Sequence, residues 1–498
     1  MVSLRSMPRW TAEADVVVLG AGLSGLVAAV TAHEAGAHVL VLEKMGPDRA
    51  GGISRVRYPQ IVWAPRPEKL SALIAYQTAL NEPNPLPEPE LRAWAEDMVG
   101  LSPWVGEHIA AAGYVWSPWD ASVLNWVPGP EFPEMPGADC VDRLFAAGPG
   151  SGGLWRAFAA LREHRGIAIR YDARAFELVQ NGDQSVAGVL AREGNQTTAV
   201  RAHRGVVVAT GGFDAAPELL RDYMGFAEAY PIGSPHNTGD GFRLLQRAGA
   251  AMWHVRNPTI TGGVWPAIKV PEHAAAFFAA QNLGVGSYIE VAKDHRRFYA
   301  ETGGWNRFHN KLQRFGGWVD QPIATMLPVH MILDDRVRRA CRLARPIYWN
   351  AEMEHRWSAD NSVEVAKGWV IQAGTIAELA AKIGRDPEAL MATVERYNTD
   401  ARLGQDPEFG RAPERVAPIL EPPFYALALV PGLVGTTGGA RRLPDGRVLD
   451  HDDHVIPGLF EAGELGSPLA NLYENGSFLT EAIRSGRAAG ASAARARS

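Results

Sequence analysis

The stretch Val16-Val17-Val18-Leu19-Gly20-Ala21-Gly22-Leu23-Ser24-Gly25 decides the fold of this 498-residue chain. Four apolar residues are followed at once by a GxGxxG turn and then by a helical pattern over residues 26–35. A second apolar run, over residues 38–42, ends in Glu43. Strand, glycine turn, helix, strand and acid in this order predict the first unit of a dinucleotide-binding α/β fold.

Each glycine of the turn has a separate expected task. Gly20 makes the tight turn, Gly22 lets backbone N–H groups approach a pyrophosphate, and Gly25 lets the helix pack on the strand. The helix N-terminus favours the anion. Glu43 is placed to accept hydrogen bonds from an adenosine ribose, and an acid there disfavours the 2′-phosphate of NADP. The alternative is a packing turn followed by a surface glutamate, which requires all these features to coincide by chance.

Length and composition indicate more than one domain. The chain has 46% hydrophobic and 21% charged residues, which is typical of a folded protein too long for a single small core. We expect a Rossmann-like domain split in sequence, over residues 1–257 and 418–498, around an inserted α+β cap over residues 258–417. The regular alternation of strands and helices breaks down in the insert, and residues 424–429 and 455–461 are expected to complete the nucleotide fold.

Charge and cysteine content exclude several classes of protein. The net charge is −6, from 49 Lys+Arg against 55 Asp+Glu, which disfavours nucleic-acid binding. Cys140 and Cys341 belong to no metal, iron–sulfur or haem ligand set, so no metal is expected, and a reducing cytoplasm is the expected location. No apolar stretch reaches the ~18 residues that a membrane span requires.

Eight short motifs in sequence order resemble those of the flavoprotein family of fumarate reductases, succinate dehydrogenases and 3-ketosteroid dehydrogenases. The resemblance spans essentially the whole chain and implies FAD as cofactor. The motifs are the glycine turn, Gly51-Gly52-Ile53-Ser54, Ala209-Thr210-Gly211-Gly212-Phe213, Thr238-Gly239-Asp240-Gly241, Arg297-Phe298-Tyr299-Ala300-Glu301, Pro423-Phe424-Tyr425-Ala426, Thr437-Gly438-Gly439 and Pro457-Gly458-Leu459-Phe460-Glu461-Ala462-Gly463-Glu464.

This resemblance implies where the cofactor is bound. Asp240 and Glu464 would contact the sugar chain of the flavin, and Asn475-Gly476-Ser477 would open a helix whose N–H groups face the flavin pyrimidine. A helix N-terminus is suited to negative charge there, although Ser477 could equally be an ordinary N-cap. Non-covalent binding is expected, because residues 49–54 hold no match for the histidine that anchors flavin in succinate dehydrogenases. The residues expected to bind FAD are Gly20, Gly22, Leu23, Ser24, Gly25, Glu43, Lys44, Gly51, Gly52, Ile53, Ser54, Ala209, Thr210, Gly211, Asp240, Gly463, Glu464, Asn475, Ser477 and Leu479.

The catalytic residues of these relatives do not carry over. Four residues after the motif that ends at residue 301, fumarate reductases have an Arg and ketosteroid 1-dehydrogenases a Tyr, where this chain has Trp305. Arg307 and His309 are candidates for a shifted proton carrier. Tyr473 resembles the Tyr that precedes the flavin-facing helix of ketosteroid 4-dehydrogenases, or it packs on the isoalloxazine edge. Tyr425 is a minor candidate, since packing is its more common role.

The expected substrate follows from two features of the sequence, the missing carboxylate clamps and the tryptophan-rich insert. The carboxylate clamps of fumarate reductases are replaced, and the insert is rich in tryptophan, so the resemblance favours oxidation or reduction of a carbon–carbon bond beside the carbonyl of an apolar cyclic ketone. Electrons would pass to or from an external partner. One alternative is a carboxylate-directed enzyme similar to fumarate reductase or tricarballylate dehydrogenase, and another is a flavin-binding subunit or sensor without catalysis. The first alternative would use Arg296, Arg297, Arg307 and Arg314, and the tryptophans are Trp265, Trp305, Trp318, Trp349, Trp357 and Trp369.

Overall fold

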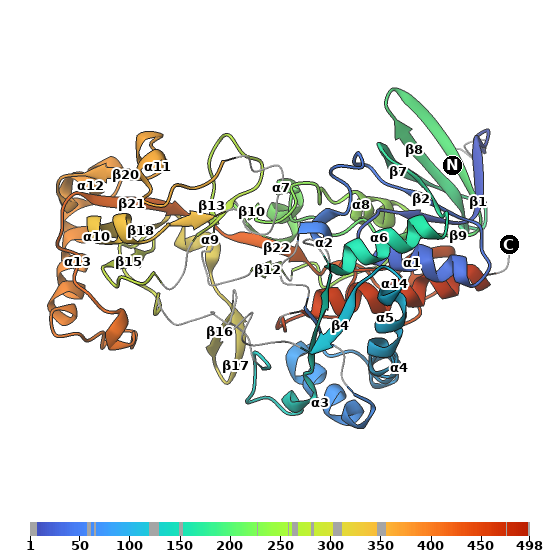
Figure 1. Ribbon diagram of the computed structural model, residues 1–498, viewed down its shortest axis with the longest axis horizontal. Helices are drawn as coiled ribbons and strands as arrows, with labels where there is room; N and C mark the ends of the chain where they lie inside the picture. Colours follow the sequence, from blue (N-terminus) through green and yellow to red (C-terminus); the bar gives the residue numbers. More distant parts are fainter. Residues whose placement is uncertain are drawn as a thin grey trace. The chain divides into compact units, whose positions relative to one another are not determined.

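The chain folds into two compact units, each assembled from segments that are distant in sequence (Figure 1). The first comprises Met1–Leu219, His236–Pro258 and Gly435–Ser498, and the second comprises Leu220–Pro235 and Thr259–Val434. The computed structural model describes residues 7–56, 61–63, 66–118, 129–148, 153–226, 228–256, 258–260, 267–279, 283–301, 311–345, 355–474 and 476–496.

An eight-stranded sheet forms the core of the first unit. Its strand order is β24-β25-β9-β1-β2-β6, with β8 and β7 attached through β9. Strand β1 pairs in parallel with both β2 and β9, so its apolar residues Val16–Leu19 are buried on both faces, as expected for a central parallel strand. The strands are β1 (Ala12–Leu19), β2 (Val39–Leu42), β6 (Ala168–Arg170), β7 (Ala173–Gln180), β8 (Val186–Glu193), β9 (Gln196–Val208), β24 (Arg447–Leu449) and β25 (Val455–Glu461).

Two long helices of the first unit pack closely against each other (Figure 1). These are α1 (Leu23–Glu34), which follows the glycine turn, and α14 (Ser477–Arg495), near the end of the chain. A Cβ added at Gly486 would lie 2.5 Å from the carbonyl oxygen of Ser24, and one at Gly490 would lie 2.4 Å from that of Ala28. Only glycine allows this approach of the two backbones. The unit also contains α2 (Gly52–Val56), α3 (Leu70–Asn81), α4 (Glu88–Val99), α5 (Leu101–Ala110), α6 (Gly153–His164), α7 (Pro217–Leu219), α8 (Asp240–Arg247), β3 (Ile61–Trp63), β4 (Val115–Pro118), β5 (Arg143–Ala147), β11 (Met252–Trp253) and β23 (Gly439–Ala440).

The second unit is built on an antiparallel sheet of order β15-β18-β21-β20. Helices α12 and α13 contribute Leu379 and Val394 to the same core as Ile289 and Ile332 of the sheet. The elements are β15 (Tyr288–Val291), β18 (Val329–Asp334), β20 (Ile371–Ala373), β21 (Phe424–Leu429), α9 (Ile323–Met326), α10 (Asp335–Ala340), α11 (Ser362–Ala366), α12 (Ile376–Lys382) and α13 (Pro387–Ala401). The shorter strands are β10 (Tyr230–Pro231), β12 (Pro258–Ile260), β13 (Ala267–Ile268), β14 (Phe277–Ala279), β16 (Lys311–Arg314), β17 (Gly317–Asp320), β19 (Ala344–Arg345) and β22 (Gly432–Thr436).

The position of β21 corrects one expectation from the sequence. Residues 424–429 were expected to complete the nucleotide fold, but they pair with β18 and β20 of the second unit, with Ala426 opposite Ile332. The last segment of the first unit therefore begins at Gly435, later than the expected residue 418. A short apolar run indicates a buried strand, but it does not specify which of two sheets the strand joins.

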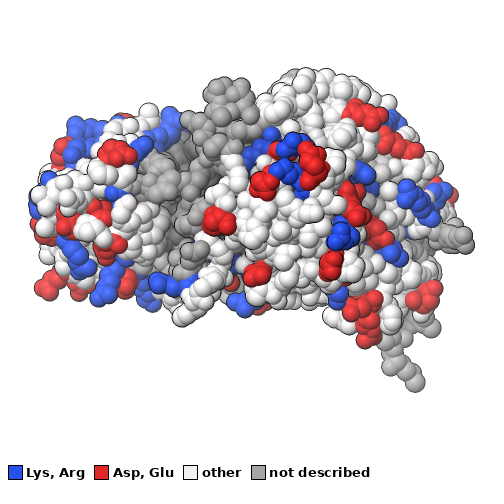
Figure 2. Space-filling view, turned by 90° about the horizontal axis from the view of Figure 1, so that it is seen from below, with Lys and Arg blue, Asp and Glu red and all other residues white. Residues whose placement is uncertain are grey.

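The charges on the surface and the apolar character of the helices are consistent with the composition of the chain. On the face shown in Figure 2, positive and negative side chains are interspersed, in keeping with the small net charge of −6. Among the helices of the described ranges, none combines the length and the apolar character needed to cross a bilayer.

Candidate functional site

The glycine turn after β1 borders a cleft in the first unit. Gly20 has a φ of +99°, and a Cβ there would lie 2.6 Å from the carbonyl oxygen of Ala209. A Cβ at Gly25 would lie 2.0 Å from the oxygen of Gly20. A Cβ at Gly22, in contrast, would meet no atom closer than 3.9 Å, and Gly22 lines the cleft. Gly20 and Gly25 are thus required by the fold, whereas the space beside Gly22 is open to a ligand.

The cleft gathers most of the residues that the sequence predicted to bind the cofactor. Its empty space is about 940 Å³, including the part that opens to solvent. The predicted residues that line it are Gly20, Gly22, Ser24, Glu43, Lys44, Gly51, Gly52, Ile53, Ser54, Ala209, Thr210, Gly211, Asp240, Gly463, Glu464 and Leu479.

Other predicted residues lie behind the lining or outside the described part. Leu23 is buried, and its N–H donates to Ser54 Oγ at 3.3 Å, while Gly25 packs on the turn. Ser477 is the first residue of α14 and not its N-cap, which is Gly476 with a φ of +92°. Ser477 Oγ is buried with no hydrogen-bond partner among the described residues. Asn475 lies outside the described residues.

Sequence reasoning missed a further group of lining residues. Asn237 directly precedes the Thr-Gly-Asp-Gly motif, and this proximity was a signal that could have identified it. Residues 173–175 carried no such signal, because they begin an ordinary alternating strand that only the fold brings beside the turn. The missed residues are Leu19, Leu42, Met45, Ala173, Arg174, Ala175, His236, Asn237, Phe478 and Ala482.

Glu43 lies at the end of β2 with its carboxylate turned toward the glycine turn. Oε2 accepts the N–H of Ala21 at 2.7 Å, and Oε1 accepts the N–H of Met45 at 2.9 Å. Each carboxylate oxygen has a second lone pair, so both remain able to accept a hydrogen bond from a ligand hydroxyl. The same side chain can therefore support the turn and bind a ribose.

Asp240, at the start of α8, is held between two cations on the cleft wall. Its Oδ2 lies 3.0 Å from Lys44 Nζ, and its Oδ1 lies 2.6 Å from a guanidinium nitrogen of Arg174. Burial acts to raise the pKa of Asp240, but the two ion pairs outweigh burial and lower that pKa below its ordinary value. Asp240 is thus ionised and fixes both basic side chains at the cleft.

The first turn of α14 forms another wall of the cleft, through Phe478 and Leu479. The ring of Tyr473 packs against Phe478 with 4.6 Å between ring centroids, and its hydroxyl oxygen accepts the N–H of Gly476 at 3.3 Å. The N-terminal turn of a helix offers N–H groups without intrahelical partners and a favourable dipole for negative charge. Tyr473 therefore belongs to the turn that positions this helix end.

Glu474, in the same turn, fixes that turn to other parts of the first unit through its buried carboxylate. One carboxylate oxygen accepts the hydroxyl of Tyr76 at 2.6 Å and the N–H of Glu131 at 3.0 Å, and the other forms an ion pair with Arg143. Burial raises the pKa of Glu474 to about 7, although Arg143 opposes that rise. A buried acid that titrates near neutrality thus lies directly beside Tyr473.

The remaining catalytic candidates are placed differently. Tyr425 is buried on β21, and its hydroxyl donates to Asp335 Oδ1 at 2.9 Å. Burial, followed by that hydrogen bond, raises the pKa of Tyr425 to about 12, an environment that favours a packing role. Trp305, Arg307 and His309 lie outside the described residues.

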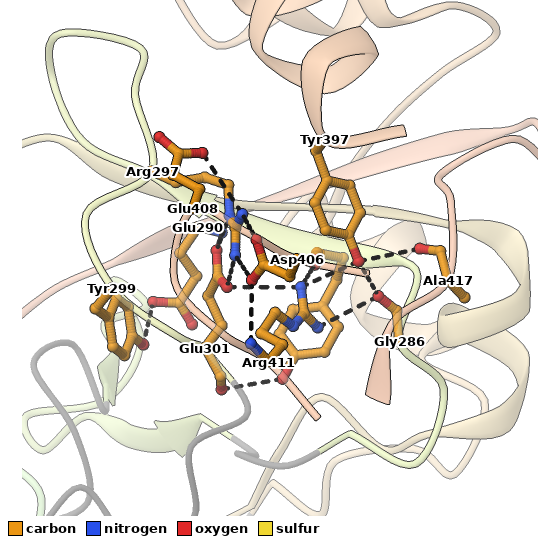
Figure 3. Close-up of polar contacts among 11 residues, drawn as sticks. Gly286, Glu290, Arg297, Tyr299, Glu301, Tyr397, Asp406, Glu408, Arg411 and Ala417 are labelled. Carbon is orange, nitrogen blue, oxygen red and sulfur yellow. Dashed lines mark hydrogen bonds and ion pairs between the residues drawn. The ribbon is translucent and has the colours of Figure 1, made fainter. Parts of the chain in front are cut away.

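In the second unit, the motif over residues 297–301 forms a closed ion network (Figure 3). Arg297 makes paired hydrogen bonds of 2.7 and 2.8 Å to Glu301, and two of 2.8 Å to Asp406. Arg411 lies 3.5 Å from the carboxylate of Glu301 and donates to the carbonyl oxygen of Tyr288 at 2.7 Å. Because Arg297, Glu301 and Asp406 are all buried, these charges hold segments of the unit together.

The fold and the cleft together define a class of protein: a dinucleotide-binding α/β protein with a split nucleotide unit, whose glycine turn, Glu43 carboxylate and helix N-terminus suit FAD. The chain belongs to the family described as the FAD binding domain, whose model matches residues 15–60 and 90–478. Its cofactor is FAD, and the resemblance identified from the sequence motifs is confirmed.

Individual relatives agree with this family. The chain is 28% identical over 468 residues to the NADH:fumarate oxidoreductase of Klebsiella pneumoniae (strain 342), covering 91% of this chain and 44% of that protein. It is 32% identical over 334 residues to the 4-oxocyclohexanecarboxylate 2-dehydrogenase of Sinomonas cyclohexanicum, covering 61% of this chain and 53% of that protein. The chain thus spans about half the length of these two relatives.

A solved structure supports the fold. The crystal structure of 3-ketosteroid delta1-dehydrogenase from Sterolibacterium denitrificans, in complex with 1,4-androstadiene-3,17-dione, superposes with a TM-score of 0.75. The match covers 97% of this chain and 100% of that chain at 23% sequence identity. At this identity the similarity establishes a shared fold.

Proposed function

We propose that the chain is an FAD-dependent oxidoreductase that adds or removes hydrogen across a carbon–carbon bond next to a carbonyl group. The observation that carries the proposal is the match to a dehydrogenase whose name describes a ring ketone, 4-oxocyclohexanecarboxylate, in a chain with an FAD cleft. The favoured substrate is an apolar cyclic ketone similar to a 3-ketosteroid. We further propose that the second unit is the substrate-binding cap.

A carboxylate-bearing substrate is the second candidate, because the names of both relatives contain a carboxylate, as fumarate or as cyclohexanecarboxylate. Such a substrate requires a cationic clamp. Arg297 is committed to Glu301 and Asp406, so it is a poor choice for that clamp. This commitment favours the apolar ketone. Non-covalent attachment of FAD, an external electron donor or acceptor and a location in the cytoplasm remain predictions from the sequence.

Different residues of the chain would bind the cofactor, stabilise charge on it and carry the proton. Bound FAD supplies hydride transfer. The glycine turn and Glu43 would hold the dinucleotide, and the N-terminus of α14 would stabilise negative charge at the flavin end. Tyr473 would hold the proton that accompanies the hydride at its hydroxyl oxygen. Arg307 and His309 are the alternative proton carriers, and Tyr425 is the least favoured of the four.

Anaerobic mixing of the purified holoprotein with a panel of compounds tests the proposed reaction. We expect a 3-ketosteroid and a simple cyclohexanone to bleach the visible absorbance of the flavin faster than succinate or tricarballylate does. A preference for the carboxylates would replace the apolar substrate by the second candidate. A flavin that no member of the panel bleaches, in either direction of the reaction, would instead indicate a binding protein without catalysis.

Tyr473→Phe tests the proton carrier. The variant keeps the ring that packs on Phe478 and removes the hydroxyl oxygen. If that hydroxyl relays the proton, bleaching by the best substrate should slow by about 10² to 10⁴, with the FAD content unchanged. Tyr425→Phe is the matched control, because its hydroxyl donates to Asp335, and its rate should remain near that of the wild type. A slowing of less than about tenfold for Tyr473→Phe would shift attention to His309 and Arg307.

A further inference from the structure

Asn237 lies on the cleft wall with its amide orientation fixed by two carboxyl groups. Its Nδ2 donates to Asp214 Oδ1 at 3.0 Å and to Glu464 Oε1 at 3.3 Å. An amide nitrogen has two hydrogens, and both are used in this way. The flipped orientation would place the carbonyl oxygen of Asn237 against Glu464 Oε1, which already accepts the N–H of Gly212, so it is disfavoured.

The carbonyl oxygen of Asn237 consequently faces the glycines of the cleft. A Cβ added at Gly211 would lie 3.0 Å from Asn237 Oδ1, and one added at Gly52 would lie 3.8 Å from the same atom. Asn237, Gly211 and Gly52 all line the cleft. The oxygen is therefore an acceptor presented beside a backbone that has no side chains to obstruct a ligand.

Asp214 differs from Glu464 in its surroundings. Asp214 is completely buried, and its Oδ2 has no hydrogen-bond partner among the described residues. Glu464 lines the cleft, and its Oε1 accepts the N–H of Gly212 at 3.0 Å. Burial, followed by the charge of Glu464, raises the pKa of Asp214 well above its ordinary value, while Asn237 and Lys44 act in the opposite direction. Burial and the neighbouring carboxyl group therefore both favour the protonated form of Asp214.

We propose that Asn237 is an FAD-binding residue, and that Asp214, in its protonated form, and Glu464 together orient its amide so that Oδ1 accepts a hydrogen bond from a donor group of the cofactor. Asp214 is a positioning residue, since it acts through Asn237. The proposal rests on FAD as the cofactor and not on the identity of the substrate. It adds two residues to the site, Asn237 and Asp214, that the sequence motifs did not assign.

A protonated Asp214 is equivalent to a neutral amide in charge and shape. Asp214→Asn should therefore retain FAD with an affinity within about twofold of the wild type at pH 7. Raising the pH should ionise Asp214 beside Glu464 in the wild type and weaken FAD binding, and Asp214→Asn should lack this contribution. Affinity is measured on holoprotein stripped of FAD by dialysis and then titrated with FAD, following the fluorescence of the flavin.

Asn237→Asp replaces the donor to two carboxyl groups with a third acceptor. We expect FAD affinity to fall by about tenfold or more. Asn398→Asp is the matched control, because Asn398 is also a buried asparagine with two hydrogen bonds, to Ile419 in the second unit, and its loss should leave FAD affinity unchanged. Combining Asp214→Asn with Asn237→Asp restores one donor–acceptor pair and should recover part of the lost affinity.

The outcomes separate the two parts of the proposal. A folded Asn237→Asp variant with wild-type affinity would overturn the role of Asn237 in binding. If Asp214→Asn weakens binding at pH 7 as much as Asn237→Asp does, or shows the same alkaline loss as the wild type, Asp214 is not the protonated partner. Because each measurement is of FAD binding alone, none depends on the proposed substrate.

Discussion

In the cleft of the first unit, the carboxylate of Glu43 can still accept hydrogen bonds from a ligand, whereas in the second unit the charges of Arg297, Glu301 and Asp406 bind one another. Glu43 binds backbone N–H groups and retains free lone pairs on the cleft wall. Arg297 instead makes bidentate bonds to two buried carboxylates. Arg297 and Glu301 belong to one of the motifs that resemble flavoproteins, and Glu464 on the cleft wall belongs to another. Such motifs can therefore serve a ligand in one place and the stability of the fold in another.

The largest effect is expected from breaking the network of the second unit. Arg297→Met leaves Asp406 buried without its ion-pair partner and Glu301 with only Arg411, 3.5 Å away, which should lower the free energy of unfolding by about 3–5 kcal/mol. Urea denaturation measures the change. Arg402→Met is the control, because the Arg402–Glu395 pair is exposed and should contribute less than about 1 kcal/mol. Equal effects of the two variants would mean that the network does not hold the unit together.

The second largest effect is expected on FAD binding at the cleft, where Gly22→Val should remove the ligand without unfolding the protein. No atom lies closer than 3.9 Å to a Cβ at this position, so the Cβ meets no clash within the protein, while the side chain fills space that the cofactor needs. Bound FAD should fall to below about a tenth of the wild-type content, with the circular dichroism spectrum retained.

Two further glycines make this result specific. Gly182→Val, at a position with no atom within 4 Å and outside the cleft, should retain FAD. Gly25→Val should unfold the protein, because its Cβ would lie 2.0 Å from the oxygen of Gly20. A folded Gly22→Val protein with full flavin content would contradict the assignment of the turn to the cofactor.

A smaller effect is expected on the pH dependence of stability, through one buried glutamate in each unit. Burial raises the pKa of Glu474 to about 7 and that of Glu290 to about 8, from an ordinary value of 4.5. A raised carboxyl pKa means that the folded protein binds more protons than the unfolded chain, so the stability that this proton provides is present below pH 4.5 and is lost as the pH rises through the folded pKa. Stability should therefore fall between pH 4.5 and 7 through Glu474, and up to pH 8 through Glu290.

Substituting each glutamate by glutamine separates the two pH ranges over which stability is expected to fall. Glu474→Gln should flatten the part of the stability profile below pH 7, and Glu290→Gln should also flatten the part between pH 7 and 8. One proton contributes at most about 1.4 kcal/mol per pH unit to this slope. Urea denaturation over the pH range gives both profiles. Unchanged slopes in both variants would show that these carboxyl groups are already ionised.

The sequence by itself determined the structural features that depend on residues close together in the chain. An apolar strand followed by a glycine turn, a helix and Glu43 is contiguous, so the nucleotide fold and the cleft lining from Gly20 to Glu43 could be predicted from the local pattern. FAD as the cofactor and the more distant lining residues, up to Leu479, were predicted from the resemblance of the motifs to those of flavoproteins. The order of the eight motifs, which resembles that of the flavoprotein family, extended the prediction across the chain.

Only the tertiary structure decided which distant segments share a surface. Arg174 meets Asp240, and Asn237 meets Asp214 and Glu464, through contacts between elements far apart in sequence. The strand over residues 424–429 joined the second unit, because pairing partners and not hydropathy choose the sheet. Burial likewise raises the pKa of Asp214 and encloses the ion pair of Arg297 with Glu301. Desolvation depends on the whole surrounding fold, so neither effect could be predicted from the order of the residues.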